Sequence, residues 1–536
     1  MSRTPLPNGD SINKLRNLVQ APKPEIKINL STRKKTYSTL DRIEGVVAVT
    51  APVDTAFDDV EIDFVGTART FVERLTSAAA VSGRAEAFHQ FLKLTQPGLQ
   101  EHYPEGGMLR AGQTYDFPFI FVIPPHLLLR ICQHTVKSPM IRDAHLQLPP
   151  SFGDKDLDKS QQYADDMAPE MASVRYGIFA KISKTKMQGD EVTKASLASK
   201  ARRLRVIPAT EEHPPLAVGD AESDYVMRRE KSVKKSVLKG KLGTLIMEAA
   251  QPQSLRLSSS QSASVMATVM LRYDPSDANA PPPKLGSLVS KLKAATFFSS
   301  TARKDFPSKH AAMHDLSQGL HTEQIGLSAR CMANVEWTKC APSKPAPERR
   351  DSACSTTSVG TGGTPAPSDN YKGKDYYTAR LLVPIELPTT KAFVPTFHSC
   401  LISRIYQLKL ELGVHTAGLA PSMELKIPIQ ISVEANQWDD MSRNRRESSP
   451  DSGADEAEVD ADDASDFFSP RTIRAPSEGF VGRSRIGSQA PIESAELPSD
   501  APPGYSPLPP ASARSEMHHR TSGFGMPWPD HTYRAV

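Results

Sequence analysis

The stretch from Phe397 to Val433 constrains the fold of this chain most, because it contains two regular alternations of apolar and polar residues. A period of two indicates β-strands with one buried face and one face in solvent. Each alternation is long enough for a strand of ordinary length. The apolar positions are Leu408, Leu410, Leu412 and Val414 in the first strand, and Leu425, Ile427, Ile429, Ile431 and Val433 in the second.

The segment between these two predicted strands reads HTAGLAPS and contains Gly418 and Pro421, which are typical of a turn. We therefore expect an antiparallel pair that closes an all-β domain. Pro428 lies within the second strand and has no backbone N–H to donate, so this strand is expected at the edge of its sheet.

Similar alternations recur along the chain, and short strands separated by turn signals favour β-sandwiches. They occupy residues 25–30, 43–51, 57–66, 109–125, 173–184, 265–273 and 376–387.

Two stretches break this pattern and are predicted as helical. Glu73–Leu94 is interrupted at Gly83 and has apolar residues at helical spacing. Lys284–Phe298 places Leu285, Leu288, Val289 and Leu292 on one helical face. Its lysines, Lys284, Lys291 and Lys293, give a candidate contact with anionic lipid, and the alternative is a helix packed on its own domain.

Composition sets broad limits on the chain. Its 536 residues have room for two or three domains, and its net charge of +4 does not indicate a nucleic-acid partner. A hydrophobic content of 38% with 45 prolines favours folded domains joined to disordered segments. The N-terminus has no apolar signal core and no apolar run reaches membrane-spanning length, so we expect an intracellular, soluble protein.

Catalytic and metal-binding signatures are missing from the sequence. The five cysteines form no CxxC pair, so reduced packing cysteines are favoured over a disulfide framework or a zinc site. No GxSxG, HExxH or P-loop pattern occurs. We therefore expect no enzyme activity, no cofactor and no bound metal.

Several stretches resemble the α-arrestin family, especially its fungal members. FHSCLISRIYQLKLEL, followed by ELKIPIQI, is similar to the closing strands of an arrestin C-terminal domain. LRAGQTYDFPFIFVIPP at residues 109–125 looks like an arrestin N-domain strand, HLQLPPSFGD follows in the family's order, and KGKLGTLIMEAAQPQSLRLS resembles the start of the C-domain. The resemblance implies two immunoglobulin-like β-sandwiches.

The expected organisation follows from this resemblance and from composition. Residues 1–24 are predicted to be disordered, 25–215 to form an arrestin-like N-terminal domain and 216–436 an arrestin-like C-terminal domain. Flexible insertions are expected near 274–318 and 341–370. Residues 437–536, which are rich in Ser, Pro and Arg, are predicted to be a disordered tail.

The predicted tail contains a PPxY motif, Pro502-Pro503-Gly504-Tyr505. Two prolines preset the extended helix that WW domains bind, and the tyrosine fills the adjacent pocket. In α-arrestins such motifs recruit WW-domain HECT-type ubiquitin ligases. The resemblance thus implies an adaptor that joins a transporter or receptor to a ligase at the plasma membrane or endosomes. The alternative is an arrestin-fold signalling scaffold or sorting adaptor without a ligase partner.

Three serines are candidate phosphorylation sites. Ser448 follows two arginines and precedes Pro450, which fits both a basophilic kinase and a 14-3-3 ligand. Ser352 is a second basophilic site, and Ser506 stands before a proline directly beside Tyr505. A solvated tail without these contacts is the alternative.

Overall fold

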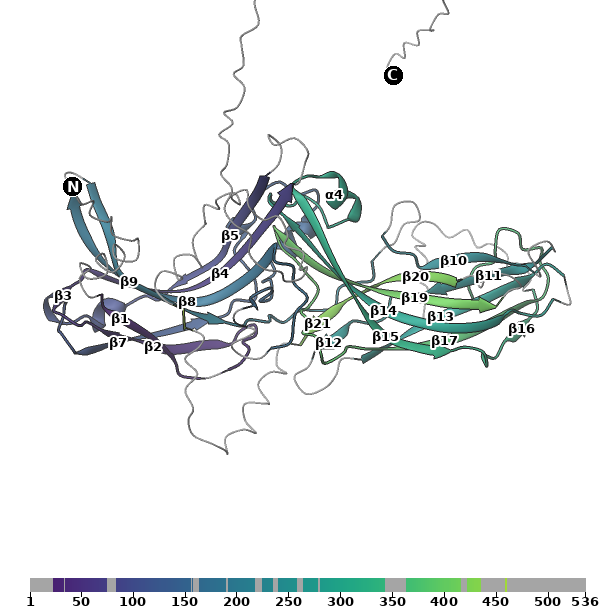
Figure 1. Ribbon diagram of the computed structural model, residues 1–536, viewed down its shortest axis with the longest axis horizontal. Helices are drawn as coiled ribbons and strands as arrows, with labels where there is room; N and C mark the ends of the chain where they lie inside the picture. The colour runs from purple at the N-terminus through teal and green to yellow at the C-terminus, as the bar shows by residue number, and fades with distance from the viewer. Residues whose placement is uncertain are drawn as a thin grey trace, which may run out of the picture. The chain divides into compact units, whose positions relative to one another are not determined.

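The computed structural model describes residues 23–434 and 458–459, and the gaps within the first range are residues 33, 75–82, 156, 158–162, 189–190, 217–223, 235–239, 258–263, 278–279, 343–362 and 416–421. All described residues belong to one compact unit, Met1–Ala475. Strands dominate them, and the few helices are short (Figure 1). The prediction of an all-β chain is therefore confirmed.

We call residues 25–215 the first half of the chain and residues 216–434 the second half. Two antiparallel sheets, built from the first half apart from the short strand β22, face each other across a shared core (Figure 1). The three-stranded sheet has the order β1 (Glu25–Leu30), β2 (Arg42–Thr50), β7 (Thr114–Val122). The five-stranded sheet has the order β22 (Glu458–Val459), β9 (Glu191–Leu204), β8 (Ala172–Gln188), β4 (Asp59–Arg74), β5 (Gly83–Thr95). A small pair joins β3 (Thr55–Ala56) to β6 (Met108–Leu109).

Two further five-stranded sheets enclose a second core. One has the order β10 (Arg228–Lys234), β11 (Lys241–Ala249), β13 (Ser264–Pro275), β17 (Tyr376–Glu386), β16 (Thr338–Cys340). The other has the order β15 (Gln318–Cys331), β14 (Lys284–Ser299), β19 (Ile402–His415), β18 (Phe397–His398), with β20 (Ser422–Ile429) also paired to β19. A short parallel pair consists of β12 (Leu255–Leu257) and β21 (Ile431–Val433).

Apolar side chains at every second position of the strands fill both cores, as predicted. Phe117, Phe119 and Phe121 of β7 are buried in the first core, while the residues between them are exposed. In the second core, Leu408 of β19 lies opposite Ile427 of β20 in an antiparallel register. These faces exclude water because every second side chain points inward.

The strand with Pro428 lies at an edge, as predicted. Within its sheet β20 pairs with β19 alone among the described strands, and Pro428 lies opposite Gln407. The predicted strand does not run unbroken to Val433, however. It ends at Ile429, and Ile431–Val433 form β21 against β12 instead.

Both predicted helices are wrong. The described part of Glu73–Leu94 belongs to β4 and β5, and Lys284–Phe298 lies within β14. β-Bulges explain the error, because an extra residue breaks the alternation and imitates helical spacing. The register of β14 against β19 shifts between Leu285 and Leu288, so both leucines face the core although they are three residues apart.

The predicted flexible insertion near 274–318 is also wrong in its main part. Residues 284–299 form β14, which lies between β15 and β19 within its sheet, and Lys309–His314 form the short helix α4. Most of the second predicted insertion, 341–370, lies outside the described residues.

Candidate functional site

Most of the predicted site residues lie outside the described part of the chain. These are Pro502, Pro503, Gly504, Tyr505, Ser352, Ser448 and Ser506. The three candidate lysines, Lys284, Lys291 and Lys293, are described and lie on β14.

The lysines of β14 do not lie on a helical face. Lys291 and Lys293 point away from the second core, because Leu292 between them is fully buried. Lys284 is exposed at the start of the strand, opposite His415 of β19. The helical argument for lipid contact therefore fails.

Carboxylates on the neighbouring strands neutralise much of this positive charge. Lys291 Nζ lies 3.5 Å from Glu411 Oε2, and Lys409 Nζ lies 2.6 Å from Glu411 Oε1. Glu424 of β20 forms ion pairs with Lys409 and Lys426, with each Nζ 3.0 Å from a carboxylate oxygen. We call Lys291, Lys409, Glu411, Glu424 and Lys426 the charge ladder.

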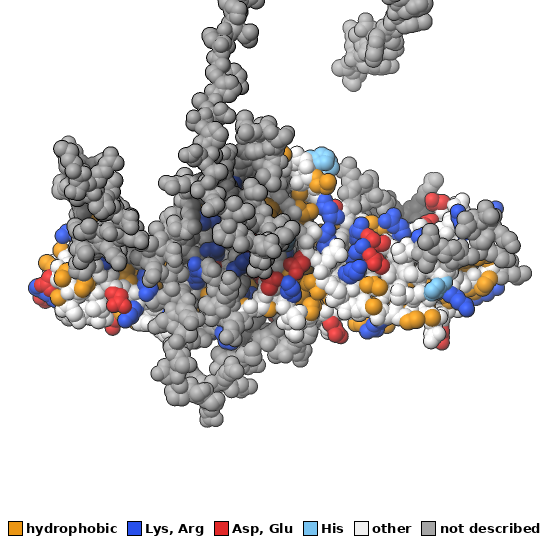
Figure 2. Space-filling model, in the orientation of Figure 1, with side chains coloured by type: hydrophobic (Ala, Val, Ile, Leu, Met, Phe, Trp, Pro, Cys, Tyr) orange, Lys and Arg blue, Asp and Glu red, His pale blue; other side chains and the backbone are white. Residues whose placement is uncertain are grey.

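The charge ladder changes the ionisation of its members. The hydrogen bond from Lys409 holds the pKa of the Glu411 carboxyl below its usual value. Partial burial, together with the charge of Lys309, lowers the pKa of the neighbouring Lys293. Basic and acidic side chains are interspersed across the face in view in Figure 2. A surface of mixed sign attracts an anionic membrane less than a purely basic patch does.

The two cores meet at the buried guanidinium of Arg404 on β19. Its side chain is 0% exposed, and it donates to Thr296 Oγ1 at 2.5 Å and to the carbonyl oxygens of Asp166 and Met167 at 3.2 Å each. The guanidinium carbon also lies 5.4 Å from the ring centre of Phe152. A charge buried this deeply requires such partners, so Arg404 fixes the 166–167 loop of the first half against β19.

Two more contacts join the same regions. Thr70 Oγ1 of β4 donates to the Ser299 carbonyl at 2.6 Å. Lys391 forms ion pairs with Asp165 at 2.7 Å and with Glu323 at 2.9 Å. The junction thus combines polar contacts with apolar packing, and Arg404 Nε is buried without a hydrogen-bond partner.

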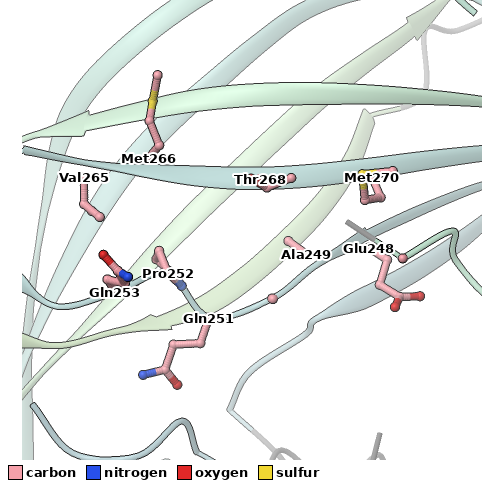
Figure 3. Close-up of a pocket in the computed structure, with 11 residues that line it drawn as sticks. Glu248, Ala249, Gln251, Pro252, Gln253, Val265, Met266, Thr268 and Met270 are labelled. Atoms are coloured by element: carbon pink, nitrogen blue, oxygen red, sulfur yellow. The ribbon is translucent and has the colours of Figure 1, made fainter. Parts of the chain in front are cut away.

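A hollow of about 240 Å³ lies beside β13 on the second half (Figure 3). Figure 3 shows Gln251, Pro252 and Gln253 from the loop after β11 and Met266 from β13 at this site. Glu248 is the one titratable residue among the described lining residues, and it pairs with Arg228 at 2.8 Å. The hollow therefore offers apolar and amide contacts, and its one carboxylate is already neutralised.

The structure also brings together four potential metal ligands that the sequence analysis did not group, so the expectation of no bound metal stays a prediction. The ligand atoms of Cys132, His134, His145 and Cys400 lie within 4.8 Å of one another. Burial lowers the pKa of His145 to about 4, and burial beside Cys132 raises the pKa of Cys400 to about 12. The only local signal in the sequence is Cys132-x-His134, which is too common to identify a site.

No protein-family model and no curated protein matches this chain. Fold and site therefore define its class only as an all-β protein with two cores joined by a polar junction. Within its described residues, no helix has both the length and the apolar character needed to cross a bilayer.

Proposed function

We propose that this chain is an α-arrestin-like adaptor. It binds a membrane-protein cargo, a transporter or receptor, through two immunoglobulin-like domains at 25–215 and 216–436. Its tail brings a WW-domain HECT-type ubiquitin ligase to that cargo and so promotes ubiquitylation and endocytosis. The protein works in the cytoplasm, is recruited to the plasma membrane or endosomes, and performs no chemistry itself.

The single observation that carries this proposal is Pro502-Pro503-Gly504-Tyr505, placed after an all-β region. A PPxY segment gains affinity from prolines that are already extended and from one buried aromatic ring. The motif lies more than 60 residues beyond β21, the last strand of the second core. A tail of this length lets ligase and cargo bind at the same time.

The arrestin resemblance gives further support, because its motifs fall on strands that build the cores. The 109–125 stretch includes β7, whose phenylalanines fill the first core. The 397–429 stretch includes β19 and β20, whose leucines and isoleucines fill the second. The stretches that carry the resemblance therefore include residues that pack both cores.

Titration of a WW domain with the full chain tests the ligase contact. We expect micromolar affinity, on the order of −7 to −8 kcal/mol, for a single short motif. Tyr505→Ala should remove most of it, because one aromatic anchor carries a large share of the binding energy. Tyr533→Ala is the matched control, since Tyr533 also lies in the tail but follows no proline pair.

Measuring cargo ubiquitylation in cells that express the same variants distinguishes an adaptor from a scaffold without a ligase partner. Cargo ubiquitylation should fall with Tyr505→Ala and stay unchanged with Tyr533→Ala. If neither substitution affects ligase binding or ubiquitylation, the chain is a scaffold or sorting adaptor whose PPGY has no role. A Ser506 phosphate beside the anchor is expected to change the WW affinity by adding charge.

We further propose that phosphorylated Ser448 binds a 14-3-3 protein that restrains the adaptor. Arginines precede Ser448 and a proline follows it at the second position, whereas Ser352 has the arginines without that proline. A Ser448 phosphopeptide should therefore bind more tightly than a Ser352 phosphopeptide in a direct titration. Equal binding, or none, would remove this regulatory step.

A further inference from the structure

We propose that Cys132, His134, His145 and Cys400 form a structural zinc site. The site is independent of the proposed adaptor function, because none of the four residues belongs to the charge ladder or the tail motif. It involves residues of both halves of the chain, and Cys400 is far from the other three in sequence.

The distances around Cys132 match tetrahedral zinc. Cys132 Sγ lies 3.3 Å from His134 Nε2 and 3.6 Å from His145 Nδ1. Zinc bonds of about 2.3 Å to sulfur and about 2.0 Å to nitrogen, meeting near the tetrahedral angle, separate such atoms by about 3.5 Å. All four ligand atoms lie within 4.8 Å of one another, so small rotations of the side chains bring them to one centre.

Three separate local structures hold the ligands in place. Cys132 directly follows the 3₁₀ turn η3 (Leu129–Ile131), and His145 is the last residue of helix α2 (Pro139–His145). Cys400 lies in the turn between β18 and β19. Hydrogen bonds between Ser399 and Ile402 close that turn, and the Arg303 backbone N–H donates to the Cys400 carbonyl at 2.9 Å. These three ligands are thus fixed by backbone contacts that do not need the metal.

The histidines show the orientation expected of zinc ligands. His134 turns Nε2 toward Cys132 and places Nδ1 3.3 Å from the carbonyl oxygen of Thr135. A proton on Nδ1 would be donated to that carbonyl, which leaves the Nε2 lone pair free for a metal. His145 turns Nδ1 toward the same sulfur and is 2% exposed.

The ligand set selects the metal and its role. Two thiolates and two imidazoles suit zinc, whereas magnesium and calcium prefer oxygen ligands. Four protein ligands complete a tetrahedron and leave no position for a substrate, which is typical of structural sites. Two thiolates also balance the charge of Zn²⁺, so the buried centre carries no net charge.

Such a site would join a loop of the first half to a turn of the second. Cys132, His134 and His145 belong to the segment between β7 and β8, while Cys400 precedes β19, the strand that carries Arg404. The metal would therefore stabilise the same junction as Arg404, because the free energy of zinc binding adds to that of folding.

Metal analysis of the full-length protein, purified without chelators, tests the site. We expect about one zinc per chain in the wild type, and near zero in His134→Ala and in Cys400→Ser. His134 is only half-buried, so His134→Ala should keep the strand signal in circular dichroism. Cys331→Ser is the matched control, since Cys331 is exposed and lies outside the cluster, and it should retain the zinc.

Cobalt substitution gives a second readout. Co²⁺ bound in place of zinc should show the visible bands of a tetrahedral ion and thiolate charge-transfer absorption, and Cys400→Ser should lose both. A wild type that holds no zinc after incubation with the metal would overturn the proposal. So would equal zinc contents in all variants, or a Cys132–Cys400 disulfide found by peptide mass mapping of the native protein.

Discussion

The two cores are filled with different side chains. The first is rich in aromatic rings, among them Phe64 and Phe91, which lie 6.0 Å and 5.4 Å from the ring of Tyr176. The second is mostly leucine, isoleucine and valine, and Tyr273 and Tyr406 are its fully buried rings among the described residues. Large rigid rings can change their packing less than aliphatic side chains can. An added methyl group should therefore destabilise the first core more than the second.

The cores also differ in where their residues come from. The first takes seven buried residues from the second half of the chain: Phe298, Val394, Phe397, Cys400, Leu401, Ile402 and Val433. The second takes only Met167 from the first half, within the described residues. The first half therefore depends on the second for a complete core, and the reverse dependence is small.

Separating the halves should have the largest effect. A fragment of residues 25–215 lacks all seven contributed side chains, and each of the six other than Cys400 is worth about 1.5–3 kcal/mol when buried. Their combined loss, about 9 kcal/mol or more, is similar to the whole stability of a typical domain. We expect this fragment to show no cooperative thermal unfolding by circular dichroism, while 216–436 retains a transition. A cooperative transition of 25–215 at the temperature of the full chain would contradict the asymmetry.

Removing the buried guanidinium at the junction should have the next largest effect. Arg404→Ala leaves Thr296 and two carbonyl oxygens without their donor and opens a cavity, which should lower the free energy of unfolding by ~3 kcal/mol or more. Denaturant titration measures this change. Arg380→Ala on the exposed face of β17 is the control and should stay within about 0.5 kcal/mol of the wild type. Equal effects of the two changes would show that the junction adds no stability.

A single methyl group tests the rigidity of the aromatic core. A Cβ at Gly45 would lie 2.2 Å from the Asn29 carbonyl oxygen and 2.6 Å from the Phe119 ring. Gly45→Ala should therefore lower the free energy of unfolding by ~2 kcal/mol. At Gly326 of β15 a Cβ meets no described atom within 4 Å, so Gly326→Ala should be neutral or slightly stabilising in the same titration.

Acid should weaken the charge ladder by a small amount. The pKa of Glu411 is lowered in the folded state, so its contribution is present above its unfolded pKa and is lost as pH falls through the folded value. Glu411→Gln should cost ~0.2–1 kcal/mol at neutral pH and nothing in strong acid. Glu386→Gln on exposed β17 is the control. A cost that persists in strong acid would mean that Glu411 acts through packing.

Local sequence was a good guide wherever a strand was regular. The leucines of β19 and the phenylalanines of β7 are buried as their alternation predicted, because side chains on a pleated strand point to opposite faces in turn. The same rule failed at bulges. Phe91 and Leu92 of β5 are adjacent and both buried, since the register against β4 shifts between Gly66 and Thr67. The sequence of one strand does not show where a β-bulge will form, because a bulge depends on how that strand pairs with its neighbour.

The sequence by itself determined the all-β class, the inward faces of regular strands and the position of the PPGY motif. Only the tertiary structure decided that Arg404 meets the 166–167 loop and that Cys400 lies beside Cys132. The physical reason is distance along the chain. Alternation is set by each residue's immediate neighbours, whereas these contacts form between segments that meet only after both sheets have packed.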